Sequence, residues 1–75
     1  MSSLDKVIQK MKNQPNGIRL EEADRVLTAN GYRLDRRNGS HCQYINKSGD
    51  VLTVVYSKPL KKAYVMAILE RIGEK

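Results

Sequence analysis

His41 is the only histidine of this sequence, and it lies beside the only cysteine, Cys42. An imidazole is well suited to proton transfer near neutral pH, because its ordinary pKa is about 6.5. The pair does not predict a metal site, since neighbours on a strand point to opposite faces and no second histidine or cysteine completes a ligand set. Ser40 precedes His41 in the chain, which is not the arrangement of a hydrolase triad. We therefore expect any catalysis by His41 to be general acid–base catalysis without a metal or another cofactor.

Basic side chains gather in two places along the chain. The sequence has 14 Lys and Arg against 8 Asp and Glu, a net charge of +6, and its two halves are equally basic. A local excess of positive charge attracts partners that carry phosphates. An ordinary solvated surface has the same composition, so charge alone leaves both interpretations open. The two clusters are Arg33, Arg36 and Arg37, and Lys58, Lys61 and Lys62.

A single imidazole beside cations is sufficient for one reaction of a phosphodiester. In RNA the 2′-hydroxyl is an internal nucleophile, so transesterification needs a base for that hydroxyl and positive charge for the phosphorane. Neither a nucleophile-elbow motif nor the fingerprints of P-loop and dinucleotide-binding folds occur in the sequence. The structural alternative is that His41 is a polar strand residue, satisfied by Asp35 or by a backbone carbonyl.

The spacing of apolar residues predicts three helices and three strands. Apolar residues recur every three or four positions in the helical segments, and Gly31 and Gly73 are suited to end two of them. After Gly31 the period changes to two, which is typical of strands. Tight turns make the sheet an antiparallel meander, and the fold class is α+β in the order α-α-β-β-β-α with the helices on one face. The expected helices are residues 4–12, 20–29 and 64–72, and the expected strands are residues 32–37, 40–46 and 51–56.

The register of the first hairpin decides where His41 points. A three-residue loop, Arg37-Asn38-Gly39, places the apolar residues of the two strands on one face, with Gly39 supplying a positive φ. In this register Asp35 lies directly across from His41, on the open side of the sheet. The residues expected to face the helices are Tyr32, Leu34, Cys42 and Tyr44.

The third strand, which runs from Val51 to Tyr56 (residues 51–56), is apolar on both faces. In a simple meander it lies at the edge of the sheet, where its hydrogen-bonding groups are open. We expect a second subunit or a dedicated partner to cover it, giving a homo-oligomer or a hetero-oligomer. A central position in a different strand order is the alternative.

The length of 75 residues predicts one domain with a single thin core. One cysteine allows no internal disulfide, which fits a reducing compartment. The sequence has no apolar run near the ~20 residues of a membrane span, and its first residues lack the layout of a secretory signal. We expect a soluble cytoplasmic protein with no membrane partner.

A longer pattern around His41 resembles the core signature of HicA-type toxins. Its parts are a helix-ending glycine with an aromatic, then Gly-Ser-His and a further aromatic. The third strand, the basic loop after it and the closing helix are similar to the same family. The residues that carry the resemblance are Gly31-Tyr32, Gly39-Ser40-His41, Tyr44, residues 51–55, Lys58-Pro59-Leu60-Lys61, Tyr64-Val65 and Ile68-Leu69.

The resemblance implies a small fold related to double-stranded-RNA-binding domains. It also implies an endoribonuclease, an mRNA interferase of a bacterial toxin–antitoxin pair, silenced by a HicB-type antitoxin, with His41 as the catalytic residue. Many members have a second histidine, but Cys42 and residues 56–58 stand in its places here. The second proton transfer is left to Asp35, Tyr44, Tyr56, a lysine or water.

The resemblance also divides the chain into two parts. Residues 1–17 correspond to the extra N-terminal helix and linker of longer family members, and residues 18–73 to the core of a single HicA-like domain.

Two further functions stay open: an RNA-binding module without catalysis, and a scaffold whose edge strand docks a partner. We expect the RNA to be contacted by Arg36, Arg37, Ser40, Lys58, Lys61 and Lys62.

Overall fold

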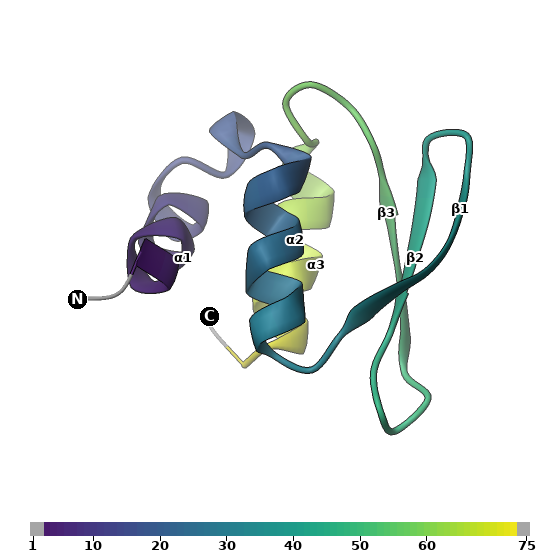
Figure 1. Ribbon diagram of the computed structural model, residues 1–75. Coiled ribbons are helices and arrows are strands. Elements are labelled where there is room, and N and C mark those ends of the chain that lie inside the picture. Colours follow the sequence, from purple (N-terminus) through teal and green to yellow (C-terminus); the bar gives the residue numbers. More distant parts are fainter. Residues whose placement is uncertain (1–2, 74–75) are drawn as a thin grey trace.

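The computed structural model describes residues 3–73 and has the predicted order of elements (Figure 1). Gly31 and Gly73 adopt φ values of 87° and 83°, just after the second and third helices. The left-handed conformation costs glycine little, so both positions end their helices as predicted. The elements are α1 (Ser3–Asn13), the 3-10 turn η1 (Pro15–Gly17), α2 (Leu20–Ala29), β1 (Arg33–Asn38), β2 (His41–Ile45), β3 (Val51–Val55) and α3 (Lys62–Arg71).

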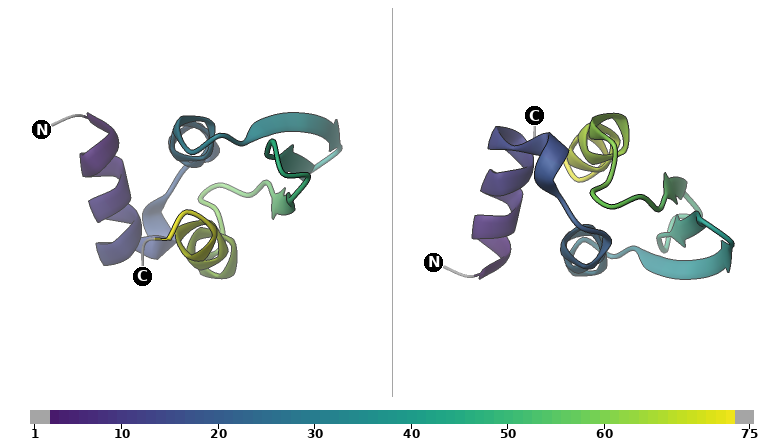
Figure 2. Two further views of the ribbon diagram at one scale, coloured as in Figure 1. Left: turned by 90° about the horizontal axis from the view of Figure 1, so that it is seen from below. Right: turned by 90° about the horizontal axis from the view of Figure 1, so that it is seen from above.

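The elements form three layers, seen end-on in Figure 2. α2 and α3 lie side by side against one face of the sheet, and α1 packs on the side of this helix pair that is turned away from the strands. The sheet is antiparallel with the strand order β1-β2-β3. The fold is therefore α+β, and the sheet has one face covered by helices and one open face.

Alternate residues of β2 and β3 reach the core, as the period of two predicts, whereas all six residues of β1 are exposed. On β2, Cys42 and Tyr44 are almost fully buried, whereas His41 is exposed. On β3, Leu52 and Val54 are buried in the same way. The helices and connections complete the core with Val7, Met11, Ile18, Ala23, Val26, Leu27, Tyr32, Leu60, Val65, Ile68 and Leu69.

The N-terminal segment is built into this core. Met11 of α1 and Ile18 after η1 are completely buried. Lys10 forms a salt bridge of 3.0 Å with Glu22 on α2, and Glu22 accepts a hydrogen bond of 3.0 Å from the backbone N–H of Arg19. Partial burial tends to raise the pKa of Glu22, but these two interactions outweigh it and hold the pKa below its ordinary value. α1 therefore also stabilises the first turn of α2.

The register of the first hairpin differs from the prediction. A two-residue turn, Gly39-Ser40, joins the strands, so Asn38 pairs with His41 instead of lying in a three-residue loop. Gly39 has a φ of 62°, which suits the first central position of such a turn. The pairing then shifts between Leu34 and Arg36, where β1 contains a bulge. The prediction assumed unbroken alternation, and the bulge breaks it.

The end of the molecule opposite this hairpin is held by paired charges. The carboxylate of Asp50 accepts a hydrogen bond of 2.8 Å from the Tyr32 hydroxyl and forms an ion pair with Arg71. The side chain of Asn46 accepts hydrogen bonds from the backbone N–H groups of Ser48 and Asp50, at 3.0 and 2.9 Å. This end, formed by Tyr32, Asn46, Asp50 and Arg71, is called the paired end below.

β3 is an edge strand, as predicted for a simple meander. Val51 is 48% exposed and lies on the open face, opposite Ile45. The alternative of a central third strand is wrong for this sheet. Within residues 3–73, no helix is long and apolar enough to cross a membrane.

Candidate active site

His41 is presented at the tip of the first hairpin, on the open face of the sheet. It is the first residue of β2 and pairs with Asn38 on one side and with Val55 on the other. Its side chain is exposed, as the prediction required, while Cys42 beside it points into the core. Across residues 3–73, no hydrogen bond or ion pair involves the imidazole. Both ring nitrogens are therefore open to a ligand.

The predicted pairing of Asp35 with His41 is wrong. Asp35 lies at the bulge, between the pairs Leu34–Tyr44 and Arg36–Gln43. It is therefore between two and three residues, or roughly 8 Å, further along the sheet than His41. The physical reason is the bulge together with the shorter turn, which move the whole of β1 relative to β2. Asp35 does not orient the imidazole in this structure.

Arg36 shares a face of the sheet with His41. It pairs with Gln43, the residue two positions after His41 on the same strand. Such a diagonal pair has Cα atoms about 7–8 Å apart, within reach of a long side chain. Arg36 is therefore the arginine of the hairpin tip that shares the open face with His41.

Arg37 points to the other face. It pairs with the buried Cys42 and lies over the ring of Tyr56, with its guanidinium carbon 5.3 Å from the ring centroid. Its Nε donates a hydrogen bond of 3.1 Å to the carbonyl of Gly39. Arg37 is therefore held in place beside the hairpin tip, but it does not share the face of His41.

The loop from β3 to α3 is tied to the hairpin and to the core. The backbone N–H of Tyr56 donates a hydrogen bond of 2.6 Å to the carbonyl of Ser40. Leu60 is buried, and its N–H donates a hydrogen bond of 2.8 Å to the carbonyl of Ile18. Lys58 and Lys61, on either side of Leu60, are both exposed. Anchoring Leu60 thus fixes the backbone from which these lysines project.

Positive charge collects at this end of the molecule. The hairpin tip, the loop after β3 and the first turn of α3 lie at the same end as the first turn of α2, which carries Glu21 and Glu22 (Figure 1). α3 begins at Lys62, and its first turn has no acidic residue. Lysines at this position oppose the helix dipole, which favours anions at a helix N-terminus. We call Arg36, Arg37, His41, Lys58, Lys61 and Lys62 the basic end.

A family model, described as the HicA toxin of bacterial toxin-antitoxin systems, matches residues 21–74. This chain belongs to the HicA toxin family. No curated protein and no solved structure gave a match.

The match identifies the chain as a toxin of a toxin–antitoxin pair, so an antitoxin partner is implied. It covers the chain from the first turn of α2 to the end of α3. α1 and η1 lie outside the matched range, although Val7 and Met11 of α1 are part of the hydrophobic core.

Tyr44 is a poor candidate for proton transfer in this HicA-family toxin. It is 1% exposed, points toward the helices, and donates a hydrogen bond of 2.8 Å to Asp24. Burial and this carboxylate raise the pKa of the tyrosine well above its ordinary value. The interpretation of Tyr32 and Tyr44 as core residues is confirmed, since both rings are buried.

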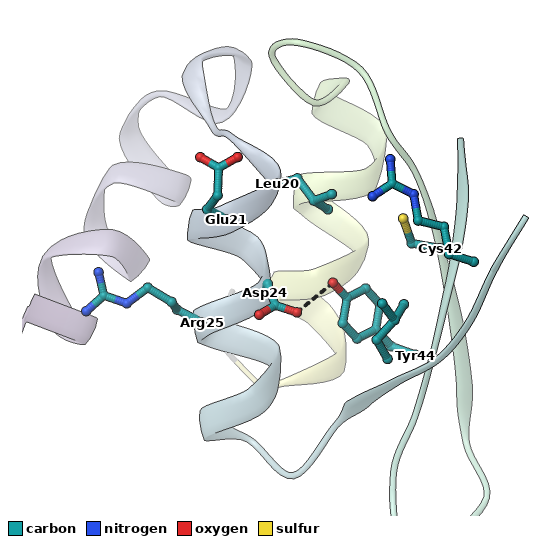
Figure 3. A pocket seen from close by; sticks show the side chains of 8 residues that line it. Leu20, Glu21, Asp24, Arg25, Cys42 and Tyr44 are labelled. Atoms are coloured by element: carbon teal, nitrogen blue, oxygen red, sulfur yellow. Dashed lines mark hydrogen bonds between the residues drawn. The ribbon is translucent and has the colours of Figure 1, made fainter. Parts of the chain in front are cut away.

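The HicA-like domain has a cleft that the sequence did not reveal. It lies between α2 and the first two strands and is lined by Leu20, Asp24, Leu34 and Tyr44 among others (Figure 3). Leu34 was expected to be covered by the helices, but it is 45% exposed because the cleft separates β1 from α2. Asp24 lies on a helix twenty positions from Tyr44, so no local pattern could have indicated their contact.

The site residues include no cluster suited to a metal. Among residues 3–73, no group of three or more His, Cys, Asp or Glu side chains is arranged to hold a metal ion.

Proposed function

We propose that this HicA-family toxin is an endoribonuclease that uses His41 as its general base. The observation that carries the proposal is the placement of an exposed imidazole, open at both nitrogens, at the tip of a hairpin within the basic end. His41 takes the proton of the RNA 2′-hydroxyl, and the 2′-oxygen attacks the adjacent phosphorus. The bond from phosphorus to the 5′-oxygen breaks, and that oxygen receives a proton. The products are a 2′,3′-cyclic phosphate and a free 5′-hydroxyl.

The cations of the basic end have different proposed roles, which follow from their positions. Arg36, on the face of His41, stabilises the negative charge of the phosphorane. Lys58, Lys61 and Lys62 bind the phosphates of the flanking nucleotides, together with the side chains of Arg37 and Ser40. No step of this mechanism requires a metal or another cofactor.

The proton for the leaving 5′-oxygen comes from water, from a lysine or from Tyr56. The register separates Asp35 from His41, and burial with a raised pKa takes Tyr44 out of this role. His41 itself can return the proton that it took, as the second step of one imidazole acting in turn as base and acid.

We further propose that the antitoxin is a HicB-type protein and that it covers the open face or the edge of β3. Val51 and Val55 leave apolar surface along this edge, next to the strand that carries His41. A partner on this edge, from Val51 to Tyr56, pairs with open backbone groups and blocks access to the imidazole. A second copy of the toxin on the same edge is the other arrangement.

The experiment is the induction of the toxin in growing bacteria, with total mRNA probed for fragments over the following minutes. Wild type is expected to arrest growth and produce fragments, and His41→Ala is expected to do neither. Thr53→Ala is the matched control, because Thr53 is exposed on the same open face of the sheet as His41 and is not part of the mechanism. Arrest and fragments with His41→Ala would contradict the catalytic role.

A non-catalytic RNA-binding module is the second candidate function. It is favoured by the lack of any carboxylate that orients the His41 imidazole within residues 3–73. Such a module binds RNA in a salt-sensitive manner but leaves it intact. The absence of fragments with wild type, together with equal RNA affinity of wild type and His41→Ala, would identify this function.

A further inference from the structure

The cleft between α2 and the first two strands has a volume of about 340 Å³. This is within the range of small-molecule sites, which are about 300–1,000 Å³. Leu20 and Asp24 point into it from α2, and Cys42 and Tyr44 point into it from β2 (Figure 3). Leu34 and Arg37 line it from β1. The walls are thus mostly apolar, and the space is sufficient for one planar ring system.

Four charged residues line this apolar space, namely Glu21, Asp24, Arg25 and Arg37, and two of them, Asp24 and Arg37, lie beside the strands. The carboxylate of Asp24 accepts the hydroxyl of Tyr44 through one oxygen, and a carboxylate has capacity for further donors. Arg37 offers guanidinium donors, and its position is fixed by the Tyr56 ring and the Gly39 carbonyl. An apolar slot with an acceptor, Asp24, and a donor, Arg37, at its strand side matches the edge of a nucleobase.

The cleft adjoins the proposed catalytic residue without sharing its face. Arg37 and Cys42 form the strand pair next to Asn38 and His41. β1 is an edge strand, so the cleft is reached around a single strand from the face of His41. A single-stranded RNA held at the basic end can therefore turn a neighbouring base over this edge and into the cleft.

We propose that the cleft binds one unstacked base of the RNA substrate and favours a base with an exocyclic amino group. This inference rests on the proposed function and adds a specificity site to it. The amino group of adenine, cytosine or guanine donates to Asp24, and Arg37 donates to a ring nitrogen or carbonyl of the base. The ring lies against Leu20 and Leu34, the apolar lining residues that keep exposed surface. Uracil has no exocyclic amino group and is the disfavoured base.

The test is an NMR titration of the full chain carrying His41→Ala with AMP, CMP, GMP and UMP. The four nucleotides have the same phosphate, so binding at the basic end contributes equally to all of them. We expect the backbone amides of Leu34 and Cys42 to shift, and UMP to bind about 10-fold more weakly than the others. Equal affinity for all four nucleotides, or shifts confined to residues 58–62, would overturn the proposal.

Two substitutions test whether the nucleotides bind in this cleft. Asp24→Asn keeps an oxygen for the Tyr44 hydroxyl but presents an amide donor, so the preference should move toward UMP. Leu34→Trp fills the cleft and should abolish the shifts, whereas Met66→Trp should not, because Met66 is exposed to a similar extent (44% against 45%) but lies on α3. An unchanged preference in Asp24→Asn, or binding that survives Leu34→Trp, would overturn the assignment to this cleft.

This test is separate from the test of catalysis, because mononucleotide binding requires no cleavage. If the wild type cleaves RNA, and the Leu34→Trp and Met66→Trp proteins with His41 intact cleave it at the same sites, the cleft proposal fails while the ribonuclease stands. If nucleotides bind with the expected preference but RNA is never cleaved, the ribonuclease fails and base recognition stands.

Discussion

Charged side chains are arranged differently at the two ends of the molecule. At the paired end, Asp50 binds both the Tyr32 hydroxyl and Arg71, and the Asn46 side chain caps the turn. At the basic end, Lys58, Lys61 and Lys62 are exposed, and none of the three takes part in an ion pair within residues 3–73. Charges paired with each other stabilise the fold, whereas like charges left together are suited to bind an anionic partner.

This contrast indicates that, in a domain of this size, residues that stabilise the fold and residues suited to binding can lie at opposite ends of the molecule. Substitutions at the paired end should change the free energy of unfolding and leave RNA binding intact. Substitutions of exposed cations at the basic end should do the reverse.

Leu60 gives the strongest test of this separation between stability and binding, because it is a core residue at the basic end. Leu60→Ala removes a side chain that is 1% exposed, and we expect the free energy of unfolding to fall by about 2–5 kcal/mol. Urea denaturation measures this change, with Lys61→Ala as the neighbouring exposed control. A loss of less than about 1 kcal/mol would show that the loop is not anchored through Leu60.

Removing the lysines at positions 58, 61 and 62 by substitution with Gln should weaken RNA binding by about 10- to 100-fold at low salt. The slope of log affinity against log salt should fall by about 2, since each phosphate contact with a single strand contributes ~0.7. Stability should stay the same or rise, because two of these charges oppose the dipole of α3.

The matched control carries Gln at positions 6, 33 and 47, which hold Lys6, Arg33 and Lys47, all exposed and outside the basic end. Both variants lower the net charge from +6 by three. If the control loses as much affinity as the first variant, total charge and not its placement governs binding.

Tyr32→Phe tests the paired end. It removes the hydroxyl that donates to Asp50 while keeping the buried ring, so we expect a loss of about 1 kcal/mol in unfolding free energy. RNA binding should be unchanged. Tyr64→Phe is the control, because no hydrogen bond of the Tyr64 hydroxyl occurs within residues 3–73. An equal loss in both variants would mean that the Asp50 contact contributes nothing.

The smallest expected effect is an acid dependence of stability. The hydrogen bonds from Arg71 and Tyr32 hold the pKa of Asp50 below its ordinary 3.8, and the pKa of Glu22 is held below its ordinary 4.5. A lowered pKa in the folded state stabilises the fold above the unfolded value, and this contribution is lost as the pH falls through the folded value. Differences in melting temperature between wild type and Asp50→Asn or Glu22→Gln should therefore be full at pH 6 and shrink toward pH 3. A difference that is constant over this range would contradict the assignment.

The sequence predicted the elements of this fold better than their register. Periodic apolar spacing and the glycines at positions 31 and 73 are local signals, and the helices and strands follow them closely. The bulge at Asp35 has no comparable signal, because a strand of exposed residues has no apolar alternation to fix its pairing. The side of the sheet on which His41 lies was nevertheless correct, since Cys42 and Tyr44 both require the core.

The roles of the candidate site residues stay predictions. The resemblance to the HicA family pointed to His41, and local clustering of charge pointed to the lysines, but the hairpin loop was predicted to end one position too early and to be one residue too long. The placement of Arg36 and Arg37 on opposite faces follows from the observed register. The cleft beside Tyr44 depends on how far β1 lies from α2, which is a property of tertiary packing.

The most direct test of the central claim is the cleavage of a defined RNA by the purified chain, with and without a chelator. We predict cleavage that is insensitive to the chelator and gives 2′,3′-cyclic phosphate ends. His41→Ala should be slower by about 100-fold or more, with RNA affinity largely retained. Strict dependence on magnesium, or equal rates for wild type and His41→Ala, would contradict the account.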